Sequence, residues 1–328
     1  MNIAISLAAI AFFSFILIKS ADLTVVSLKF ISSRTKTGLF ALSALVLAVG
    51  TSLPELSVAF TSAMEGSSNL SLGVVLGSNI ANISLVAGAA AMFAGKVTVT
   101  KNYLKRDALI ALVASIAPML LILDGGLSRV DGLVLLAIYA SYASSFFKKQ
   151  YQMIAKGALS ETAFHSMLRK FSFTDSKNSR EYGKLFVGIA LLLFSSNMIV
   201  RFSKLFATEA GIPVFLVGLF ILAIGTSLPE LAFSFRSLKD KEPSMFLGNL
   251  LGSTIANSTL IIGVATVLSP LEVRAINEYI TAVVASVIIY GVFWFFIRTK
   301  RELARAEAAI LLILYAAFVV VELLVNRG

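Results

Sequence analysis

Ten long apolar stretches alternate with short polar segments along the chain. Each is about twenty residues or longer, the length that an α-helix needs to cross the hydrocarbon core of a bilayer. Because lipid offers the backbone no hydrogen-bond partners, such stretches must be helical. They lie at residues 3–30, 38–64, 68–93, 103–123, 129–148, 182–206, 211–237, 244–268, 276–297 and 304–325. The pattern predicts an all-α integral membrane protein with ten transmembrane helices.

The composition agrees with a chain that lies mostly in lipid. Hydrophobic residues make up 58% of the 328 positions and charged residues 14%, whereas soluble domains have about 25% charged residues. Cysteine is absent and the single histidine, His165, lies in a polar stretch, which excludes thiolate and imidazole metal sites. The net charge of +10 does not indicate nucleic-acid binding, because Lys and Arg lie in the loops, where they set membrane orientation. The lipid bilayer is the expected surrounding.

An internal duplication divides the chain into two halves. The seven residues Gly50–Leu56 recur letter for letter at Gly225–Leu231, a shift of 175 positions. The same shift superposes, without a gap, Gly77-Ser78 on Gly252-Ser253 and Ile80-Ala81-Asn82 on Ile255-Ala256-Asn257. Chance similarity between apolar segments would not keep the polar positions in register, so the repeat is genuine. We expect a first five-helix repeat at 1–148, a basic linker at 149–180 and a second repeat at 181–328.

Each half holds five predicted spans, so the second half must enter the membrane in the opposite sense to the first. With the N-terminus outside, 22 of the 28 Lys and Arg residues fall on the cytoplasmic side and 5 on the outer side, while Lys19 lies within the first span. Positive charge accumulates on the cytoplasmic side of membrane proteins. The sequence therefore predicts two inverted repeats in the cell membrane, with both termini outside and the linker in the cytoplasm.

Each copy of the repeated motif places a carboxylate and a helix-breaking proline deep inside an apolar segment. Pro54 lacks an N–H, and its ring clashes with the carbonyl one turn earlier, so the helix should break there. Thr51 and Glu55 are four residues apart and share a helix face, as do Ser78 and Asn82. The second half repeats this arrangement with Thr226, Glu230, Ser253 and Asn257. Oxygen ligands without sulfur or imidazole favour hard cations such as Ca²⁺ and Na⁺, at broken helices between the repeats.

Other interpretations of these residues stay open at this point. Pro54 and Pro229 could be simple kinks, and Glu55 and Glu230 could form structural ion pairs. Ion pairs are disfavoured because the second, third, seventh and eighth spans hold no Lys or Arg in their interiors. Ser78 and Ser253 could serve helix packing. Four glycines are expected to be close-packing positions rather than ligands: Gly73, Gly88, Gly248 and Gly263.

The two Gly-Thr-Ser-Leu-Pro-Glu copies, with Gly-Ser-Asn-Ile-Ala-Asn and Gly-Ser-Thr-Ile-Ala-Asn after them, resemble the cation/calcium exchanger superfamily in its sodium/calcium exchanger branch. The resemblance covers the whole chain and implies a secondary active antiporter, not an enzyme, with no cofactor beyond the transported Ca²⁺ and Na⁺. It implies a site between the second, third, seventh and eighth spans. The implied ligands are Glu55 and Glu230 for Ca²⁺, with Thr51, Thr226, Asn82 and Asn257, and for flanking Na⁺ positions Ser52, Ser78, Ser227, Ser253 and the carbonyls of Ala48 and Ala223. It also implies that the first and sixth spans slide as a gate, and we expect a functional monomer.

One position departs from the resembled branch. Many sodium/calcium exchangers carry Asp at the position of Asn257, whereas both halves here carry Asn, as the proton-coupled branch tends to do. Exchange of Ca²⁺ for Na⁺ is the leading hypothesis, and H⁺-coupled Ca²⁺ exchange on the same site is the alternative. Two other classes are a passive cation channel and an intramembrane hydrolase that uses the two Glu residues as an acid–base pair. The lack of a His-based metal motif and the internal symmetry argue against the hydrolase.

Overall fold

The computed structural model describes residues 3–34, 52–98, 102–153, 176–272, 277–299 and 302–325, and nearly all of them are helical. In the first half the helices are α1 (Ile3–Arg34), α3 (Leu53–Met64), α4 (Ser68–Ala81), η1 (Asn82–Val86), α5 (Ala87–Ala94), α6 (Asn102–Leu121), η2 (Ile122–Asp124) and α7 (Arg129–Met153). In the second half they are α9 (Ser176–Ala210), α10 (Val214–Leu216), η4 (Val217–Leu222), α11 (Ala223–Thr226), α12 (Leu228–Lys239), α13 (Pro243–Ile255), η5 (Ala256–Ile261), α14 (Ile262–Leu268), α15 (Asn277–Thr299) and α16 (Arg305–Val325).

Consecutive helices combine into spans that correspond to the ten predicted segments, and the second segment is described from Ser52 onward. Within the described residues, eight helical segments are long and apolar enough to cross a membrane. The remaining two predicted spans correspond to α3 and α7. The helices flanking the predicted linker both reach into it, because α7 continues to Met153 and α9 begins at Ser176. The chain is thus a multi-pass membrane protein of the predicted fold class.

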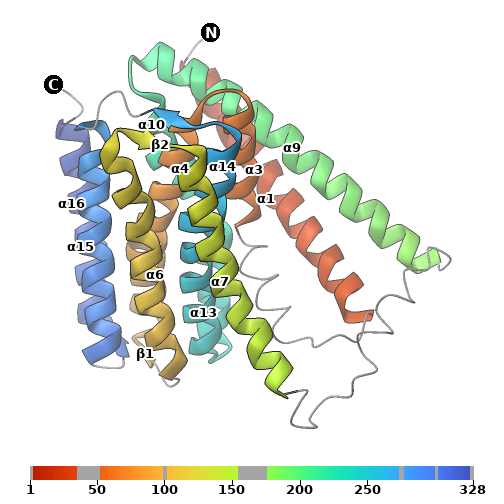
Figure 1. The fold of residues 1–328 in the computed structure, drawn as a ribbon, viewed down its shortest axis with the longest axis vertical. Helices are drawn as coiled ribbons and strands as arrows, with labels where there is room; N and C mark the ends of the chain where they lie inside the picture. The colour runs from red at the N-terminus through yellow and green to blue at the C-terminus, as the bar shows by residue number, and fades with distance from the viewer. Residues whose placement is uncertain are drawn as a thin grey trace.

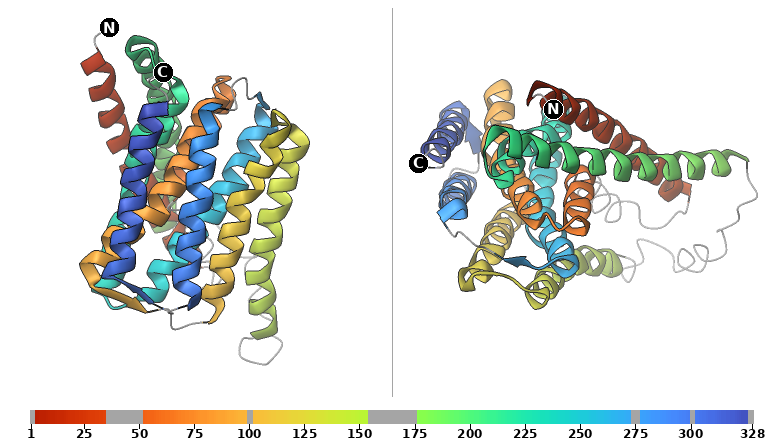
Figure 2. Two further views of the ribbon diagram at one scale, coloured as in Figure 1. Left: turned by 90° about the vertical axis from the view of Figure 1, so that its left-hand side faces the viewer. Right: turned by 90° about the horizontal axis from the view of Figure 1, so that it is seen from above.

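Two long helices pack mainly on each other and touch the rest of the molecule along one side. α1 and α9 pack along each other and slant across one side of the molecule (Figures 1 and 2). The third helical segment of each half lies at the centre instead: in an apolar stretch of 18 residues, 94% are buried for α4 to α5 and 83% for α13 to α14, against 22% for α1 and for α16. The serines and asparagines of the repeated motifs, Ser78, Asn82, Ser253 and Asn257, therefore fall on the most enclosed helical segments.

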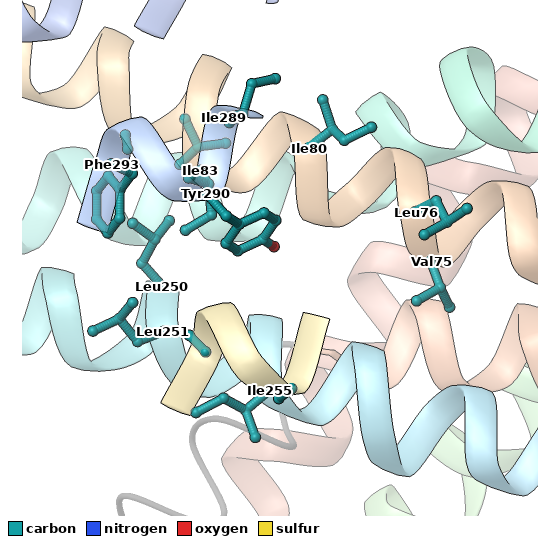
Figure 3. Packing of buried hydrophobic residues seen from close by; sticks show 14 of the residues in the cluster. Val75, Leu76, Ile80, Ile83, Leu250, Leu251, Ile255, Ile289, Tyr290 and Phe293 are labelled. Atoms are coloured by element: carbon teal, nitrogen blue, oxygen red, sulfur yellow. The ribbon is translucent and has the colours of Figure 1, made fainter. Parts of the chain in front are cut away.

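Apolar side chains from both halves fill the centre of the molecule. Val75, Leu76 and Ile80 of α4 belong to one buried cluster with Leu250 and Leu251 of α13 (Figure 3). Ile83 of η1 and Tyr290 and Phe293 of α15 belong to the same cluster, and each is at most 2% exposed. The two repeats therefore share one core.

Short strands join the two halves at both ends of the bundle. β1 (Lys96–Thr98) of the first half pairs antiparallel with β4 (Glu302–Ala304) of the second. β2 (Gly126–Leu127) of the first half pairs antiparallel with β3 (Leu271–Glu272) of the second. Each pairing is thus made across the repeats, as an approximate twofold axis between them requires.

Two glycine contacts show how closely the halves repeat each other. A Cβ atom on Gly88 would lie 2.9 Å from Leu312 Cγ and 3.0 Å from the Ala308 carbonyl oxygen. A Cβ atom on Gly263, 175 positions later, would lie 2.9 Å from Leu136 Cγ and 3.0 Å from the Gly132 carbonyl oxygen. Helices α5 and α16 therefore pack as α14 and α7 do.

The predicted close-packing role is confirmed for Gly88 and Gly263 and also for Gly73, where a Cβ atom would lie within 2.3 Å of the Phe215 carbonyl oxygen. Gly248 differs, because no atom of the described residues lies within 4 Å of the place that a Cβ atom would occupy. The role predicted for Gly248 therefore finds no support in the described part of the chain.

Candidate cation-binding site

The break predicted at the repeated proline is visible in the second half. α11 ends at Thr226, Ser227 forms a turn, and α12 begins at Leu228 with Pro229 in its first turn. In the first half, α3 begins at Leu53 with Pro54 in the same place. Pro is tolerated in a first turn because the N–H that it lacks has no helical partner there. The second half therefore breaks and restarts its second span at the motif, and in the first half a helix begins at the equivalent residue.

The two motif carboxylates lie in the first turns of these new helices. Glu55 of α3 and Glu230 of α12 are both 0% exposed. The N-terminal end of a helix carries a partial positive charge, which favours a carboxylate in the first turn. The serines that precede the helices, Ser52 and Ser227, are 1% and 3% exposed. Both copies of the motif thus hold their polar groups inside the protein.

The third span of each half is widened at the predicted amide residue. Asn82 opens the π-helical segment η1, and Asn257 is the second residue of the π-helical segment η5. Single π-helical turns within α-helices occur often at functional sites. The Ser84 hydroxyl donates to the Ile80 carbonyl at 2.5 Å, and the equivalent Thr259 hydroxyl donates to the Ile255 carbonyl at 2.6 Å. Sequence reasoning missed these paired hydroxyls, although both follow the motif Asn by two positions.

The structure brings polar residues of the two halves together. The hydroxyl oxygens of Ser78 and Thr226 lie 3.2 Å apart and share a hydrogen bond. The carboxylate of Glu55 faces these same two hydroxyls. The Ser253 hydroxyl donates to the Leu250 carbonyl at 3.1 Å. One carboxylate and two hydroxyls, drawn from both repeats, therefore converge at the break of the helices.

Several buried oxygen and nitrogen atoms here have no hydrogen-bond partner of normal geometry among the described residues. They are the hydroxyls of Ser52 and Ser227, both carboxylate oxygens of Glu55, and both side-chain amide atoms of Asn82 and of Asn257. Unsatisfied buried polar groups are costly and are rare in native structures. Their concentration in the duplicated motifs indicates a site built for a polar or charged ligand.

Three of the ligands implied by the resemblance are not buried side chains of the described residues: two are not described, and one is a backbone carbonyl that has hydrogen-bond partners. Thr51 and Ala48 lie outside the described residues. The carbonyl of Ala223 is described, and it accepts the Ser227 N–H at 3.1 Å and the Thr226 hydroxyl at 3.4 Å. All the other implied ligands are at most 3% exposed and lie on α3, α4, η1, α11, α12, α13 or η5 or at their first turns.

Sequence reasoning also missed a second polar group next to the motifs. Asn79, Ser115, Ser258 and Tyr290 are all at most 3% exposed and are joined by hydrogen bonds. Asn79 directly follows the repeated Gly77-Ser78 pair, and Ser258 directly follows the motif Asn257. The position of Asn79 and Ser258 directly beside motif residues was the sequence signal that could have revealed them. Ser115 and Tyr290 lie in apolar helices, and their sequence surroundings gave no such signal.

Broken helices that meet at the interface of two inverted repeats, around buried carboxylate, hydroxyl and amide oxygens, are the architecture of a secondary transporter. The chain belongs to the sodium/calcium exchanger protein family, whose model matches residues 5–148 and 182–324. The family consists of membrane transporters that exchange cations, and the predicted family is therefore confirmed.

Similar proteins match across most of the chain. The putative antiporter CaxA of Alkalimonas amylolytica is 28% identical over 305 residues, which cover 92% of this chain and 94% of the relative. The sodium/calcium exchanger MaX1 of Methanosarcina acetivorans is 28% identical, with 93% and 95% covered. The inner membrane protein YrbG of Escherichia coli is 30% identical, with 76% of each chain covered.

Solved structures of the sodium-calcium exchanger NCX_Mj share the fold. One obtained with Na⁺ and Sr²⁺ matches with a TM-score of 0.63 and covers 97% of this chain and 99% of that one. At 24% sequence identity the match supports the fold alone. It agrees with the ten-span architecture described above.

Proposed function

We propose that this protein is a secondary active antiporter that exchanges Ca²⁺ for Na⁺ across a membrane by alternating access, with Glu55 and Glu230 as its central ligands. The observation that carries this proposal is the convergence of Glu55, Ser78 and Thr226 from the two repeats at a helix break. Around them the amides of Asn82 and Asn257 are buried and unsatisfied among the described residues. A cation would supply the partner that these oxygens require.

The charge of the site supports a cation as the ligand. Among the side chains whose burial the structure describes, no Lys or Arg is buried, whereas Glu55 and Glu230 are both 0% exposed. Burying a carboxylate without a counter-charge is costly. Two ionised carboxylates balance one Ca²⁺, and the same oxygens can hold Na⁺. Because the two ions compete for shared ligands, the site carries one load or the other, and this competition couples their opposed movements.

The names of two relatives support the same activity. CaxA is described as a putative antiporter and MaX1 as a sodium/calcium exchanger, and both align over more than nine-tenths of this chain. The arrangement of α1 and α9 supports the gating part of the proposal. These two helices pack mainly on each other along one side of the molecule (Figure 1). A rigid movement of the pair would expose the site to one side and then to the other. The charge asymmetry of the loops supports an outside location for both termini.

Asn257 keeps proton coupling as the second candidate. Both repeats carry an amide at this position, so the centre holds at most two negative charges. A neutral amide offers an oxygen to Na⁺ but cannot itself carry a proton. If Na⁺ is not the coupling ion, Glu55 and Glu230 must take up the protons in exchange for Ca²⁺.

The deciding experiment is an ion-gradient assay with purified protein in liposomes. Liposomes loaded with Ca²⁺ are given an inward Na⁺ gradient or an inward H⁺ gradient, with the membrane potential clamped. We expect the Na⁺ gradient to drive Ca²⁺ out and the pH gradient to have little effect. Ca²⁺ movement driven only by the pH gradient would replace the leading proposal with its alternative. Ca²⁺ flux that follows its own gradient and ignores both others would indicate a channel.

A further inference from the structure

A chain of buried hydrogen bonds lies beside the candidate site, on α4, η5, α6 and α15. The Asn79 side-chain amide donates to the Ser258 hydroxyl at 2.7 Å, and the Ser258 hydroxyl donates to the Ser115 hydroxyl at 3.4 Å. The Tyr290 hydroxyl donates to the backbone carbonyl of Asn79 at 3.3 Å. Figure 3 shows the Tyr290 ring within the apolar cluster of the core. This polar chain is therefore enclosed by packed side chains.

The shortest of these bonds ties the two repeats together directly next to the proposed ligands. Asn79 follows Ser78 on α4, and Ser258 follows Asn257 on η5. A hydrogen bond of 2.7 Å between the two neighbours fixes the distance between α4 and η5 at this level. Since Ser78 and Asn257 belong to the same two helical segments, the bond also constrains the width of the site between them.

The hydrogen bond between Asn79 and Ser258 has no equivalent at the symmetry-related positions, although the ligands are duplicated. The shift of 175 places Thr254 at the position equivalent to Asn79, and Ser258 is the equivalent of Ile83. Ile83 is fully buried among apolar side chains and has no polar group to offer. The fold therefore accommodates an apolar residue at this place in the first half. Buried hydrogen bonds exchanged for well-packed apolar groups cost little stability.

We propose that Asn79 and Ser258 are positioning residues that set the width of the cation site and thereby its selectivity among divalent cations of different size. The proposal rests on the proposed function. Selectivity among hard cations depends on cavity size, ligand number and rigidity. Without the link, α4 and η5 can move apart and accept a larger ion.

The test compares Ser258→Ala with the matched control Ser286→Ala. Ser286 is also a buried serine in this core, but its hydroxyl donates to the Ala282 carbonyl of its own helix, α15, at 2.7 Å. The thermal stabilisation of purified protein by Ca²⁺, Sr²⁺ and Ba²⁺ is measured for each variant, together with the inhibition of Ca²⁺ uptake by Ba²⁺. We expect Ser258→Ala to shift the apparent affinity ratio toward Ba²⁺ by about fivefold, the effect of one lost hydrogen bond. Ser286→Ala should keep the wild-type ratio.

An unchanged ratio in Ser258→Ala, or an equal shift in Ser286→Ala, would overturn the positioning role. Asn79→Leu removes the donor at similar volume and should shift the ratio in the same direction. A wild-type protein that no cation stabilises would count against the proposed function itself, whereas a cation series that Ser258→Ala leaves intact counts only against this inference.

A second, independent observation concerns the contact between α3 and the slanted helix α9. The hydroxyls of Thr61 and Ser196 lie 2.8 Å apart. One turn further along α3, Glu65 accepts from the Asn197 amide at 2.7 Å and from Lys204 Nζ at 2.9 Å. We name these five residues the α3–α9 latch, because their polar contacts hold α9 against α3.

The other repeat contains the counterpart of this latch. α3 and α12 end alike: the Glu65 N–H donates to the Thr61 carbonyl at 3.0 Å, and the Asp240 N–H donates to the Arg236 carbonyl at 2.9 Å. The shift of 175 therefore places Arg236 and Asp240 at the positions of Thr61 and Glu65. On α1 it places Asp22 at the position of Asn197. Arg236 and Asp22 carry opposite charges.

The two sets differ in this conformation. Arg236 Nε lies 3.4 Å from Asp240 Oδ2 on its own helix, and these side chains are 81% and 57% exposed. In the α3–α9 latch, Lys204 and Glu65 are 36% and 25% exposed. At the end near Arg34 and Ser176, α1 and α9 extend away from the other helices (Figures 1 and 2). One latch is thus closed while the exposed charges of α12 are turned to solvent.

We infer that the two latches alternate: the α3–α9 latch closes in this conformation, and Arg236 closes onto Asp22 of α1 in the opposite one. In an inverted repeat, exchanging the conformations of the two halves generates the second access state. The contacts of the first half in one state then become the contacts of the second half in the other. This inference also rests on alternating access in the proposed function.

Because the natural chain has no cysteine, a Thr61→Cys/Ser196→Cys pair reports closure of the α3–α9 latch by its rate of disulfide formation. Adding Lys204→Gln should lower that rate about fivefold, the size of one favourable ion pair. Adding Arg236→Gln as well should restore it, because both latches are then weakened. Lys184→Gln, which removes an ion pair within α9 to Glu181, is the control and should leave the rate unchanged.

If the two substitutions merely damaged the fold, their effects on the rate of disulfide formation would add and would not cancel. A double variant that cross-links as slowly as Lys204→Gln alone, or more slowly, would overturn the alternation. The cross-linking assay needs no ion gradient, so a failure of Ca²⁺ exchange in liposomes would sink the proposed function without deciding this result.

Discussion

The hydroxyl of Ser78 and the hydroxyl of Thr226 share a hydrogen bond of 3.2 Å, although 148 positions separate them in the chain. Ser78 belongs to the third span of the first repeat and Thr226 to the second span of the second repeat. The carboxylate of Glu55 faces both. The candidate site is therefore made by neither half alone, and changes in either half should affect the same ion.

Removal of either central carboxylate charge should abolish exchange. For Glu55→Gln and Glu230→Gln we expect the apparent Ca²⁺ affinity to fall at least about 100-fold, since even groups one shell beyond a metal contribute about 10–100-fold. The amide keeps the shape of the side chain, so the protein should still fold. Ca²⁺ uptake into liposomes and size-exclusion profiles check both statements. Glu181→Gln on α9 is the control, and coupled transport in either central variant would contradict the site.

An acidic group at Asn257 should change the ion preference. Asn257→Asp adds a third carboxyl to the centre, next to Glu55 and Glu230, and with it a group that can bind a proton. We expect the dependence of Ca²⁺ exchange on Na⁺ concentration or on pH to shift. Exchange is measured across a matrix of Na⁺ concentrations and pH values, with Asn249→Asp outside the motif as a comparison. Identical Na⁺ and pH profiles in wild type and Asn257→Asp would show that this position does not select the coupling ion.

Two glycines at equivalent positions should respond oppositely to one methyl group. In Gly73→Ala the new Cβ would overlap the Phe215 carbonyl oxygen, so α4 must shift, and we expect a loss of about 1–3 kcal/mol in stability. In Gly248→Ala no atom of the described residues obstructs the Cβ, and the better helix propensity of Ala should leave stability unchanged or raise it by up to about 1 kcal/mol. Thermal unfolding in detergent measures both, and equal losses would contradict the difference in packing.

Loss of the Tyr290 hydroxyl should lower the stability of the protein, because this hydroxyl donates a hydrogen bond to the backbone of α4. Tyr290→Phe keeps the ring in the apolar core but removes the hydroxyl that donates to the Asn79 carbonyl. We expect a loss of about 1 kcal/mol in stability, the usual contribution of one buried hydrogen bond. Thermal unfolding compared with Tyr315→Phe, on the outer helix α16, checks this, and equal stability of Tyr290→Phe and wild type would contradict the contact.

The sequence predicted the helices well because their pattern depends on the solvent and little on neighbours. Apolar length marks each span, and the helix boundaries in the structure agree with the segments to within a few residues over most of the chain. The inverted repeat followed from the same register that later superposes Gly88 on Gly263. The local sequence determines these features, so they can be predicted without knowing how the helices pack.

Other features depend on how helices tilt and could not be predicted. Tyr290 looks like any core aromatic until α15 packs beside α4 and its hydroxyl meets a carbonyl. Glu65 and Lys204 look like solvated loop charges until the slant of α9 brings them to 2.9 Å. The widened turns at Asn82 and Asn257 have no composition that distinguishes them from ordinary helix. The identity of the ligands remains a prediction, and Thr51 and Ala48 lie outside the described residues.

The two strand pairs carry a consequence for the origin of the molecule. β1 and β2 find their partners in β4 and β3, so each half completes its edges with the other half. Two copies of a single five-helix unit, lying antiparallel in one bilayer, would make the same pairings as a homodimer. The connection between α7 and α9 then joins two units whose arrangement the strand pairings already define. Fusion also freed the halves to diverge, as Ser258 has from Ile83.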